Sequence, residues 1–367
     1  MKICHIINSL SGGGAETHLL DLVKAQRNEG HELYVIAIGP DKKNMASLEP
    51  QFKEIVNKVY RLSAPRLFNP ISYRVLFNIQ KNMLFDVVHT HQPRSDSMFY
   101  TINSLLPYKP KWIVSIHGKY DTYLEGRVSL NFLKKLLIPL LVLIWSKSNH
   151  VICISNEVGN WLSNYSERVK FSVVNYWVEP TVFKQIEGNI NKINIGFLGR
   201  INKNKGIEDL LNLFLDLDDI NLQLLIGGTG KKSYLDNIKY KYKLDKKSNI
   251  KFLDYVNNKN EFFSEIHLFV FPSYSEGLGL VLLEAMSHSK ICITRNVSPM
   301  NAILNKEIGF LFDNQSDFKE KIQSAIDMIK NDKTTADKKL LNQYNLLNEK
   351  YCKEVLFKKI ESIYLNG

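Results

Sequence analysis

The 367-residue chain has few cysteines, no long apolar run and fewer acidic than basic residues. Its four cysteines stand far apart without a Cys-x-x-Cys pair, which excludes a disulfide framework and a zinc-finger site and predicts reduced, buried thiols. The most apolar segment, 136–145, is far shorter than the roughly 20 residues that cross a bilayer, and Pro139 interrupts it. The first residues lack the apolar core of a signal peptide, so we expect a protein that is neither exported nor membrane-spanning.

The shortage of acidic residues makes the protein basic, because 48 lysines and arginines against 37 acidic residues give a formal net charge of +11. This charge favours a polyanionic partner: nucleic acid, an anionic lipid surface or a phosphorylated small molecule. No zinc-finger spacing, helix-turn-helix pattern or RNP-like aromatic pattern accompanies it, so no nucleic-acid partner is expected. A composition of 44% apolar and 23% charged residues is that of a globular protein.

Short apolar runs alternate with amphipathic stretches along the whole chain. Continuous apolar runs are typical of parallel strands that are buried on both faces. In the first half they lie at 3–7, 33–38, 55–60, 87–90, 112–116, 151–154 and 171–174, and in the second half at 193–198, 222–226, 250–253, 268–271, 291–294 and 310–312. We therefore predict an α/β protein with two doubly wound sheets, and its length also predicts about two domains.

The predicted joint is the segment 179–191, where Pro180, Gly188 and several asparagines interrupt the pattern. Residues 1–180 would form an N-terminal Rossmann-like domain and residues 190–345 a C-terminal one. The remaining residues, 346–367, carry apolar side chains at helical spacing and could pack on either domain.

A glycine-rich turn, 12–14, separates the first predicted strand from a helix predicted over 15–27. Glycines let the backbone approach an anion, and the N-terminus of the following helix favours negative charge. The turn lacks the third glycine of a dinucleotide fingerprint, since Thr17 stands at that position. We predict a phosphate contact here, with a plain tight turn as the alternative.

A second anion site is predicted in the second half, at Arg200 and Lys205, directly after the strand at 193–198. A guanidinium grips a diphosphate through two parallel hydrogen bonds, and a lysine adds a point charge. A solvated basic loop is the alternative, but ligands of open α/β sheets bind at the carboxyl ends of strands.

A pair of glutamates, Glu276 and Glu284, flanks the predicted start of an apolar helix near residue 280. Eight helical steps span about 12 Å, the reach from a sugar across a diphosphate to a ribose. Carboxylates accept hydrogen bonds from hydroxyls, so sugar and ribose suit them. A structural salt bridge is the alternative for Glu284. The backbone N–H groups that would meet the phosphates belong to Gly277, Leu278, Gly279 and Leu280.

Together with Leu225-Ile226-Gly227-Gly228-Thr229-Gly230, these motifs in this order resemble glycosyltransferase family 4 over nearly the whole chain. The resemblance implies retaining enzymes of the GT-B fold, with two facing Rossmann-like domains and a C-terminal helix that crosses back to the first domain. It also implies a nucleoside-diphosphate-sugar donor of UDP or GDP type, held mainly by the C-terminal domain, with no cofactor and no metal. We accordingly interpret the acidic run 216–219 as a solvated loop.

The resemblance also implies roles for individual residues at matching positions. His117 and Glu276 would face the reacting sugar as the catalytic candidates, although a histidine that merely closes a strand end is the alternative for His117. The donor diphosphate would be bound by Arg200, Lys205, Gly13, Gly14, Gly277, Leu278, Gly279 and Leu280. The ribose would be bound by Glu284, the base by Gly228, Tyr255 and Val256, and the acceptor by Glu16, His91 and Arg94, with His89 as a weaker candidate. Two segments, 175–179 and 287–300, depart from the family pattern.

The predicted function is therefore transfer of a hexosyl or N-acetylhexosaminyl group, without a metal, to a glycan acceptor that is lipid-linked. The pathway would be bacterial surface polysaccharide synthesis of the lipopolysaccharide O-antigen or capsule type. Alternatives are a GT-B nucleotide-sugar epimerase or hydrolase, a phosphorylase and a non-catalytic basic binding protein.

Basic residues beside an apolar stretch, Arg127, Lys134 and Lys135 next to 136–145, predict contact with an anionic membrane surface. A buried helix is the favoured alternative for 140–145. We expect a cytoplasmic protein, peripheral on the inner face of the cell membrane.

Overall fold

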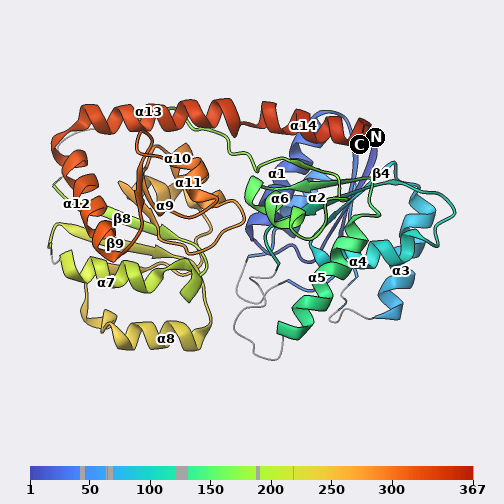
Figure 1. The fold of residues 1–367 in the computed structure, drawn as a ribbon, viewed down its shortest axis with the longest axis horizontal. Helices are drawn as coiled ribbons and strands as arrows, with labels where there is room; N and C mark the ends of the chain where they lie inside the picture. Colours follow the sequence, from blue (N-terminus) through green and yellow to red (C-terminus); the bar gives the residue numbers. More distant parts are fainter. Residues whose placement is uncertain are drawn as a thin grey trace. The chain divides into compact units, whose positions relative to one another are not determined.

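The computed structural model describes residues 1–41, 46–62, 64, 69–120, 131–186, 191–217 and 219–366, without the side chains of 131–135. The chain divides into two compact units, Met1–Tyr176 with Leu356–Gly367, and Trp177–Val355. Each unit is built on its own sheet (Figure 1). Of the residues named above, Arg127, Gly188 and Asp218 lie outside the described ranges.

Unit 1 contains a seven-stranded sheet in which every neighbouring pair is parallel. Its order is β3-β2-β1-β4-β5-β6-β7, so the chain winds outward from β1 in one direction and then from β4 in the other. The strands are β1 (Lys2–Ile7), β2 (Glu32–Ala37), β3 (Lys58–Arg61), β4 (Val87–His91), β5 (Lys111–Ile116), β6 (His150–Cys153) and β7 (Phe171–Val173). The carboxyl ends of β1 and β4 meet at the switch point, where ligands of such sheets bind.

Helices cover this sheet. Two of them begin at side-chain caps that follow a loop: the Asn69 oxygen accepts from the amides of Ile71 and Ser72, and the Ser155 oxygen accepts from that of Val158. The helices are α1 (Gly14–Asn28), α2 (Glu49–Ile55), α3 (Pro70–Met83), α4 (Pro93–Asn103), α5 (Asn131–Trp145), α6 (Asn156–Ser163) and α14 (Lys353–Asn366).

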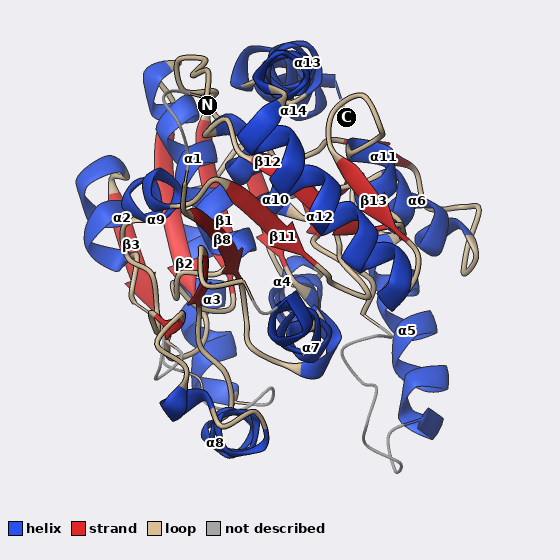
Figure 2. Cartoon of the chain, turned by 90° about the vertical axis from the view of Figure 1, so that its left-hand side faces the viewer, coloured by secondary structure: helices blue, strands red, loops and turns tan. Residues whose placement is uncertain are grey.

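Unit 2 repeats the architecture with a six-stranded parallel sheet of order β10-β9-β8-β11-β12-β13. The strands are β8 (Ile193–Leu198), β9 (Leu222–Gly227), β10 (Ile250–Phe252), β11 (Leu268–Phe271), β12 (Ile291–Arg295) and β13 (Phe310–Phe312). The helices are α7 (Ile207–Leu217), α8 (Lys232–Lys241), α9 (Lys259–Glu265), α10 (Leu280–Ser287), α11 (Met300–Ile303), α12 (Gln315–Asn331) and α13 (Lys333–Lys350). Helices and strands alternate around each sheet (Figure 2).

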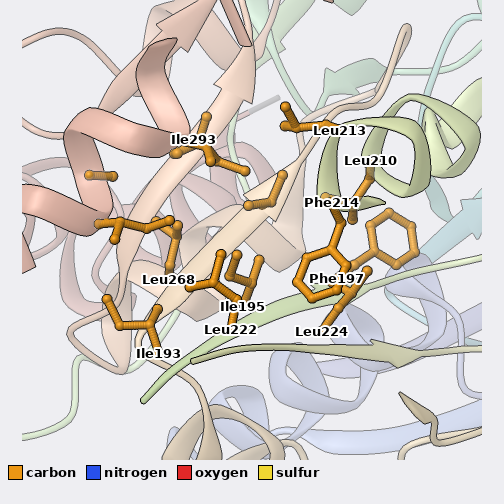
Figure 3. Packing of buried hydrophobic residues seen from close by; sticks show 14 of the residues in the cluster. Ile193, Ile195, Phe197, Leu210, Leu213, Phe214, Leu222, Leu224, Leu268 and Ile293 are labelled. Carbon is orange, nitrogen blue, oxygen red and sulfur yellow. The ribbon is translucent and has the colours of Figure 1, made fainter. Parts of the chain in front are cut away.

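The core of unit 2 is formed by aliphatic and aromatic side chains from strands and helices. Phe197 on β8 and Phe214 on α7 pack together with Leu224 on β9, and all three are buried (Figure 3). Because the strands bury both faces, they contain continuous apolar runs, as the sequence predicted. Most charged residues of this unit therefore lie in its loops and on its helices, and its described strands contain only two, Lys251 on β10 and Arg295 at the end of β12.

Two details of the sequence prediction are wrong. The run 55–60 is not one strand, because Ile55 ends α2 and β3 begins only at Lys58. The segment 140–145 is only partly buried, since Leu140 and Leu143 on α5 are 50% and 55% exposed. Both errors arise where an edge strand or an outer helix has one open face. The four cysteines are buried and free, and no helix in the described ranges has the length and apolar content to span a bilayer.

Candidate functional site

The loops that follow β8, β9 and β11 meet at one edge of the second sheet, and glycines allow their contact. A Cβ at Gly228, where φ is +131°, would lie 1.8 Å from the Gly199 carbonyl oxygen. A Cβ at Gly206, where φ is +66°, would lie 2.2 Å from the Pro272 carbonyl oxygen. Only glycine permits backbones to approach so closely. The basic loop after β8 is therefore held against the loop that leads into α10.

Lys205 and Glu276 lie together in this contact as an ion pair. The Lys205 Nζ atom also lies 5.5 Å from the centre of the Phe271 ring, the last residue of β11. Arg200 is exposed and forms no hydrogen bond or ion pair with any described residue. One cation of the predicted diphosphate site is thus neutralised by a predicted sugar-binding carboxylate, and the other is available to solvent.

The N-terminus of α10 opens at the same place. Gly279 caps the helix with φ of +84°, a left-handed conformation that glycine adopts without strain. The N–H groups of the first turn of a helix have no partners within the helix and carry partial positive charge. The residues 277–280 directly follow Glu276, the ion-pair partner of Lys205, and anion binding by their N–H groups stays a prediction.

Glu284 lies one turn inside α10, and its side chain is 15% exposed. Its Oε1 atom accepts a hydrogen bond from Lys259 Nζ at 2.6 Å, from the first turn of α9. The salt-bridge alternative considered for Glu284 thus has a partner in the structure. Ribose binding by Glu284 stays a prediction, and it would require a hydroxyl to share or replace the lysine.

The residues predicted to contact the base also lie near this edge. The Gly228 N–H donates to the Asp254 carbonyl at 2.6 Å, and the Val256 side chain packs against Gly227, where an added Cβ would meet it at 2.7 Å. Tyr255 stands between Asp254 and Val256 in the β10–α9 loop, and its side chain is half-buried. The predicted base contacts therefore lie beside the loop that carries Arg200.

An ion-pair cluster that the sequence analysis missed braces the β11–α10 loop. Arg295, at the end of β12, contacts the Asp209 carboxylate at 2.5 Å. The Tyr274 hydroxyl donates to the same carboxylate at 2.6 Å, and its ring stacks 4.0 Å from the Arg295 guanidinium. The loop that carries Glu276 is therefore anchored by a cation–π contact and a shared acceptor.

In unit 1 the glycine turn caps α1, with Gly13 at the N-cap and Gly14 as the first helical residue. Glu16 is buried, and its Oε1 accepts hydrogen bonds from Ser9 Oγ and Gln92 Nε2, both at 3.4 Å. Arg94 donates from Nη2 to the Ala64 carbonyl at 2.6 Å. Glu16 and Arg94, both predicted on the acceptor side, thus contact the protein itself in this structure.

The structure brings several histidines onto one face of the first sheet. In the parallel register His5 on β1 pairs with His89 on β4, and His91 pairs with Ser115 on β5. Side chains two residues apart along a strand share a face, which adds His117 to the set. The side chains of His89-x-His91 and Ser115-x-His117 therefore form one polar cluster with His5 between the sheet and its covering helices.

A continuous chain of hydrogen bonds runs through this cluster. His5 Nε2 contacts Gln26 Oε1 at 2.8 Å, and His5 Nδ1 contacts His91 Nε2 at 3.1 Å. His91 Nδ1 contacts His117 Nε2 at 3.2 Å, and the Tyr176 hydroxyl contacts His117 Nδ1. His117 thus uses both ring nitrogens within the protein, and a ligand that binds it must displace one of them.

A second branch of the cluster contains His89, which connects the sheet to the end of the chain. Its Nδ1 contacts the Tyr364 hydroxyl of α14 at 2.6 Å, and its Nε2 contacts Ser115 Oγ at 2.7 Å. On the same face of α14, Glu361 accepts from His31 at 2.7 Å. The C-terminal residues therefore complete the polar interior of unit 1.

Burial keeps these imidazoles neutral. Desolvation lowers the pKa of His117 to about 3 and that of His5 to about 4, and the Gln26 hydrogen bond opposes the shift at His5. The pKa values of His18, His89 and His91 are lowered well below the usual value by burial first and by neighbouring histidines second.

The ring nitrogens of His5, His89 and His91 lie within 4.8 Å of one another, a spacing that a shared metal ion also requires. Each of their six nitrogens already has a hydrogen-bond partner in the protein. An ion would have to displace several of these bonds. The donor set therefore fits a hydrogen-bonded network of neutral rings.

Some residues of both sites escaped the sequence analysis. His5 stood inside an apolar run and Gln26 on an amphipathic helix, so neither had a local signal. Tyr176 falls in the segment 175–179 that departs from the expected pattern, and this departure was the available clue. Lys259 and Tyr364 belong to elements distant in sequence from their partners, which only the fold brings together.

Two family profiles match the chain. Residues 12–181 match "Glycosyltransferase Family 4", and residues 179–340 match "Glycosyl transferases group 1". Together these ranges span most of the sequence, one in each unit.

Relatives and solved structures agree with these matches. The chain is 25% identical over 295 residues to the capsular polysaccharide biosynthesis glycosyltransferase CapM of Staphylococcus aureus, covering 76% of each chain. It is 22% identical over 381 residues to the O-antigen biosynthesis glycosyltransferase WclY of Escherichia coli, covering 100% of this chain and 98% of that one. The structure of Anabaena Alr3699/HepE in complex with UDP and glucose superposes with a TM-score of 0.81 at 14% identity, covering 99% of this chain and 98% of that chain. This likeness confirms the GT-B fold expected from the sequence.

Proposed function

The chain belongs to glycosyltransferase family 4, the glycosyl transferases group 1, and on this premise we propose a specific reaction for it. It transfers a hexosyl or N-acetylhexosaminyl group, with retention, from a nucleoside-diphosphate sugar to a glycan acceptor. The acceptor is lipid-linked, and the product contributes to a bacterial surface polysaccharide. The names of the capsule and O-antigen relatives support the pathway, and the UDP and glucose named with the Anabaena structure support the donor class.

The observation that carries the proposal is the convergence of cations and helix N–H groups at one edge of the second sheet. Lys205 contacts Glu276, which directly precedes the residues 277–280 at the N-terminus of α10, and Arg200 is exposed in the loop that carries Lys205. Such a site stabilises charge that develops on a departing diphosphate, which is commonly the largest catalytic contribution. Because protein cations supply this charge, we expect transfer without an added divalent metal.

The proposed chemistry needs no protein nucleophile. The bond from the anomeric carbon to the diphosphate oxygen breaks while a bond to the acceptor oxygen forms on the same face, and the acceptor's proton passes to the departing diphosphate. The two candidate carboxylates, Glu276 and Glu284, carry lysine partners in the structure, which suits binding roles better than nucleophilic attack. Glu276 would exchange its lysine for a sugar hydroxyl as the diphosphate binds Lys205.

Membrane contact is the second part of the proposal, and the outer surface of α5 supports it. Leu136, Leu140 and Leu143 are 63%, 50% and 55% exposed along this helix, and Lys147 follows it at the surface. Apolar side chains beside cations favour the interface of an anionic bilayer. We place the enzyme on the inner face of the cell membrane, where a lipid-linked acceptor would be reached.

A donor panel tests the reaction. Purified protein is incubated with UDP-, GDP- and ADP-sugars, with and without extracted lipid-linked acceptor and with EDTA, while nucleoside diphosphate release and sugar products are followed. We expect release with one donor class that requires the acceptor, survives EDTA and yields a retained linkage. A rearranged nucleotide sugar would instead establish an epimerase, acceptor-independent release a hydrolase, and no release with any donor would reject the enzyme.

The same assay with the acceptor in vesicles tests the membrane part. Anionic vesicles should sediment the protein and raise the transfer rate relative to zwitterionic vesicles of equal acceptor content. The variant Leu140→Ser with Leu143→Ser should lose both effects and keep its activity on detergent-dispersed acceptor. Equal binding to both vesicle types would show that the charged membrane surface plays no part.

A further inference from the structure

The histidine chain of unit 1 has a fixed direction, which follows from the chemistry of its members. A neutral imidazole carries one N–H donor and one bare nitrogen acceptor. Gln26 Oε1 can only accept, so His5 Nε2 must carry the proton and His5 Nδ1 must be bare. His5 Nδ1 then accepts from His91 Nε2.

The same logic continues to the end of the chain. His91 Nδ1 is bare and accepts from His117 Nε2, so the bare nitrogen of His117 is Nδ1. That atom accepts the hydroxyl proton of Tyr176. The three histidines thus share one tautomer, and reversing the Gln26 amide would reverse every hydrogen bond up to Tyr176.

The orientation of the Gln26 amide follows from its contact with His5, because Oε1 is the amide atom that lies 2.8 Å from His5 Nε2. The Nε2 atom of Gln26 makes no hydrogen bond of standard geometry within the described part of the chain.

We propose that Gln26, His5 and His91 are positioning residues that hold His117 as the tautomer with a bare Nδ1, so that this atom accepts a hydrogen bond from a substrate hydroxyl. The Tyr176 hydroxyl occupies that place in the ligand-free protein, and the substrate hydroxyl replaces it. The inference rests on the proposed function, because it assumes that His117 faces a sugar. It adds the direction of the hydrogen bond. The site selects a ligand that donates to His117 Nδ1 and disfavours one that can only accept.

Gln26→Met is the decisive variant, because it keeps a side chain of similar size and removes the acceptor that orders the chain. Gln26→Glu keeps an acceptor at the same place. Gln343→Met is the matched control, since Gln343 is also buried but lies in unit 2, where it donates to the Ile308 carbonyl. Near-ultraviolet circular dichroism would establish that each variant is folded.

The first readout is the tautomer itself, from long-range proton–nitrogen NMR correlations of ¹⁵N-histidine-labelled protein without ligand. Wild type and Gln343→Met should show His117 with its proton on Nε2, and Gln26→Met should show a mixture of tautomers. A wild-type His117 that is protonated on Nδ1, or a Gln26→Met protein with unchanged tautomers, would overturn the proposal. This result is independent of any transferase activity.

The second readout is kinetic. Loss of one ordered hydrogen bond is worth about 1–2 kcal/mol, so Gln26→Met should lower kcat/KM for transfer roughly 5- to 30-fold. Gln26→Glu should retain most of the activity, as should Gln343→Met. If Gln26→Glu is as impaired as Gln26→Met, the role of Gln26 is packing and the proposal fails. If the tautomers behave as expected while no donor reacts, the positioning network stands and the proposed transferase function fails.

Discussion

The ion pairs at the proposed donor site show which properties of single residues the sequence predicts and which it does not. Lys205, Glu276 and Glu284 were each identified from their position after a strand or within the start of a helix. Their pairing was not predictable, because Lys205 lies 71 residues from Glu276, and Lys259 lies 25 from Glu284. Partner choice depends on which loops the fold brings together, and the chain has many lysines to choose from.

Arg200 differs from these residues because it is exposed and unengaged by the described residues, so its replacement should cost no folding stability. Arg200→Ala would remove the proposed charge-assisted contact to the diphosphate, worth about 1.5–3 kcal/mol, and should lower kcat/KM for the donor roughly 10- to 100-fold. Lys203→Ala, an exposed cation in the same loop, is the control and should change kcat/KM little. Steady-state kinetics with varied donor measures both, and equal effects would mean that only the general positive charge matters.

At the scale of elements, the strands were predictable because parallel strands buried on both faces have continuous apolar sequence. The starts of the helices that follow glycine turns were also predictable, because the glycines are a local signal in the sequence. The start of the edge strand β3 and the exposed face of α5 were not predictable. Each has one face open to solvent, which weakens the apolar pattern on which the prediction depends. The histidine network was also beyond reach, since its geometry follows from strand register, which no local motif specifies.

The contact between the β8 and β11 loops rests on Gly206. In Gly206→Ala the new Cβ would meet the backbone oxygen of Pro272, which cannot rotate away, and φ of +66° adds strain. We expect a loss of about 2–5 kcal/mol in the free energy of unfolding and a raised KM for the donor.

Gly30→Ala provides the matched control, because φ there is +80° but no atom lies within 4 Å of the added Cβ. Only the left-handed strain remains, about 1 kcal/mol. Urea denaturation of the two variants separates strain from collision. Similar losses of unfolding free energy in the two variants would show that the loops can move apart to make room for a methyl group.

At the scale of the whole molecule, the two units differ in how they respond to acid. Unit 1 contains six histidines whose pKa values are lowered, and in five of them the shift is large: His5 to about 4, His117 to about 3, and His18, His89 and His91 well below 6.5. The sixth is His150, whose pKa is also lowered by burial. Below pH 6.5 the unfolded chain binds protons that the folded chain does not. The stability from neutral burial is therefore complete above pH 6.5 and is lost as the pH falls toward 4.

One group opposes this trend. Burial raises the pKa of Asp96 to about 7, so the folded chain binds that proton more tightly and gains stability between pH 7 and 3.8. Each proton is worth about 1.4 kcal/mol per pH unit, and five histidines outweigh one aspartate. Unit 1 should consequently lose stability steeply on acidification.

Chemical denaturation at pH 7 and pH 5, followed by tryptophan fluorescence, measures this loss. Trp112, Trp145 and Trp161 lie in unit 1, so the signal reports mainly on it. The midpoint should fall at pH 5, and His91→Asn should show a shallower pH dependence than wild type, whereas His288→Asn in unit 2 should match wild type. A midpoint that does not move between these pH values would contradict the neutral-histidine account.

The contact of Tyr364 with His89 has a consequence for biosynthesis. A ribosome releases residues in order, so the strands of unit 1 emerge first and the whole of 177–355 emerges before Tyr364 is made. Until Tyr364 has been synthesised, His89 lacks its tyrosine partner and the nascent unit remains incomplete. Unit 1 therefore completes its polar interior only after the whole of 177–355 has been synthesised.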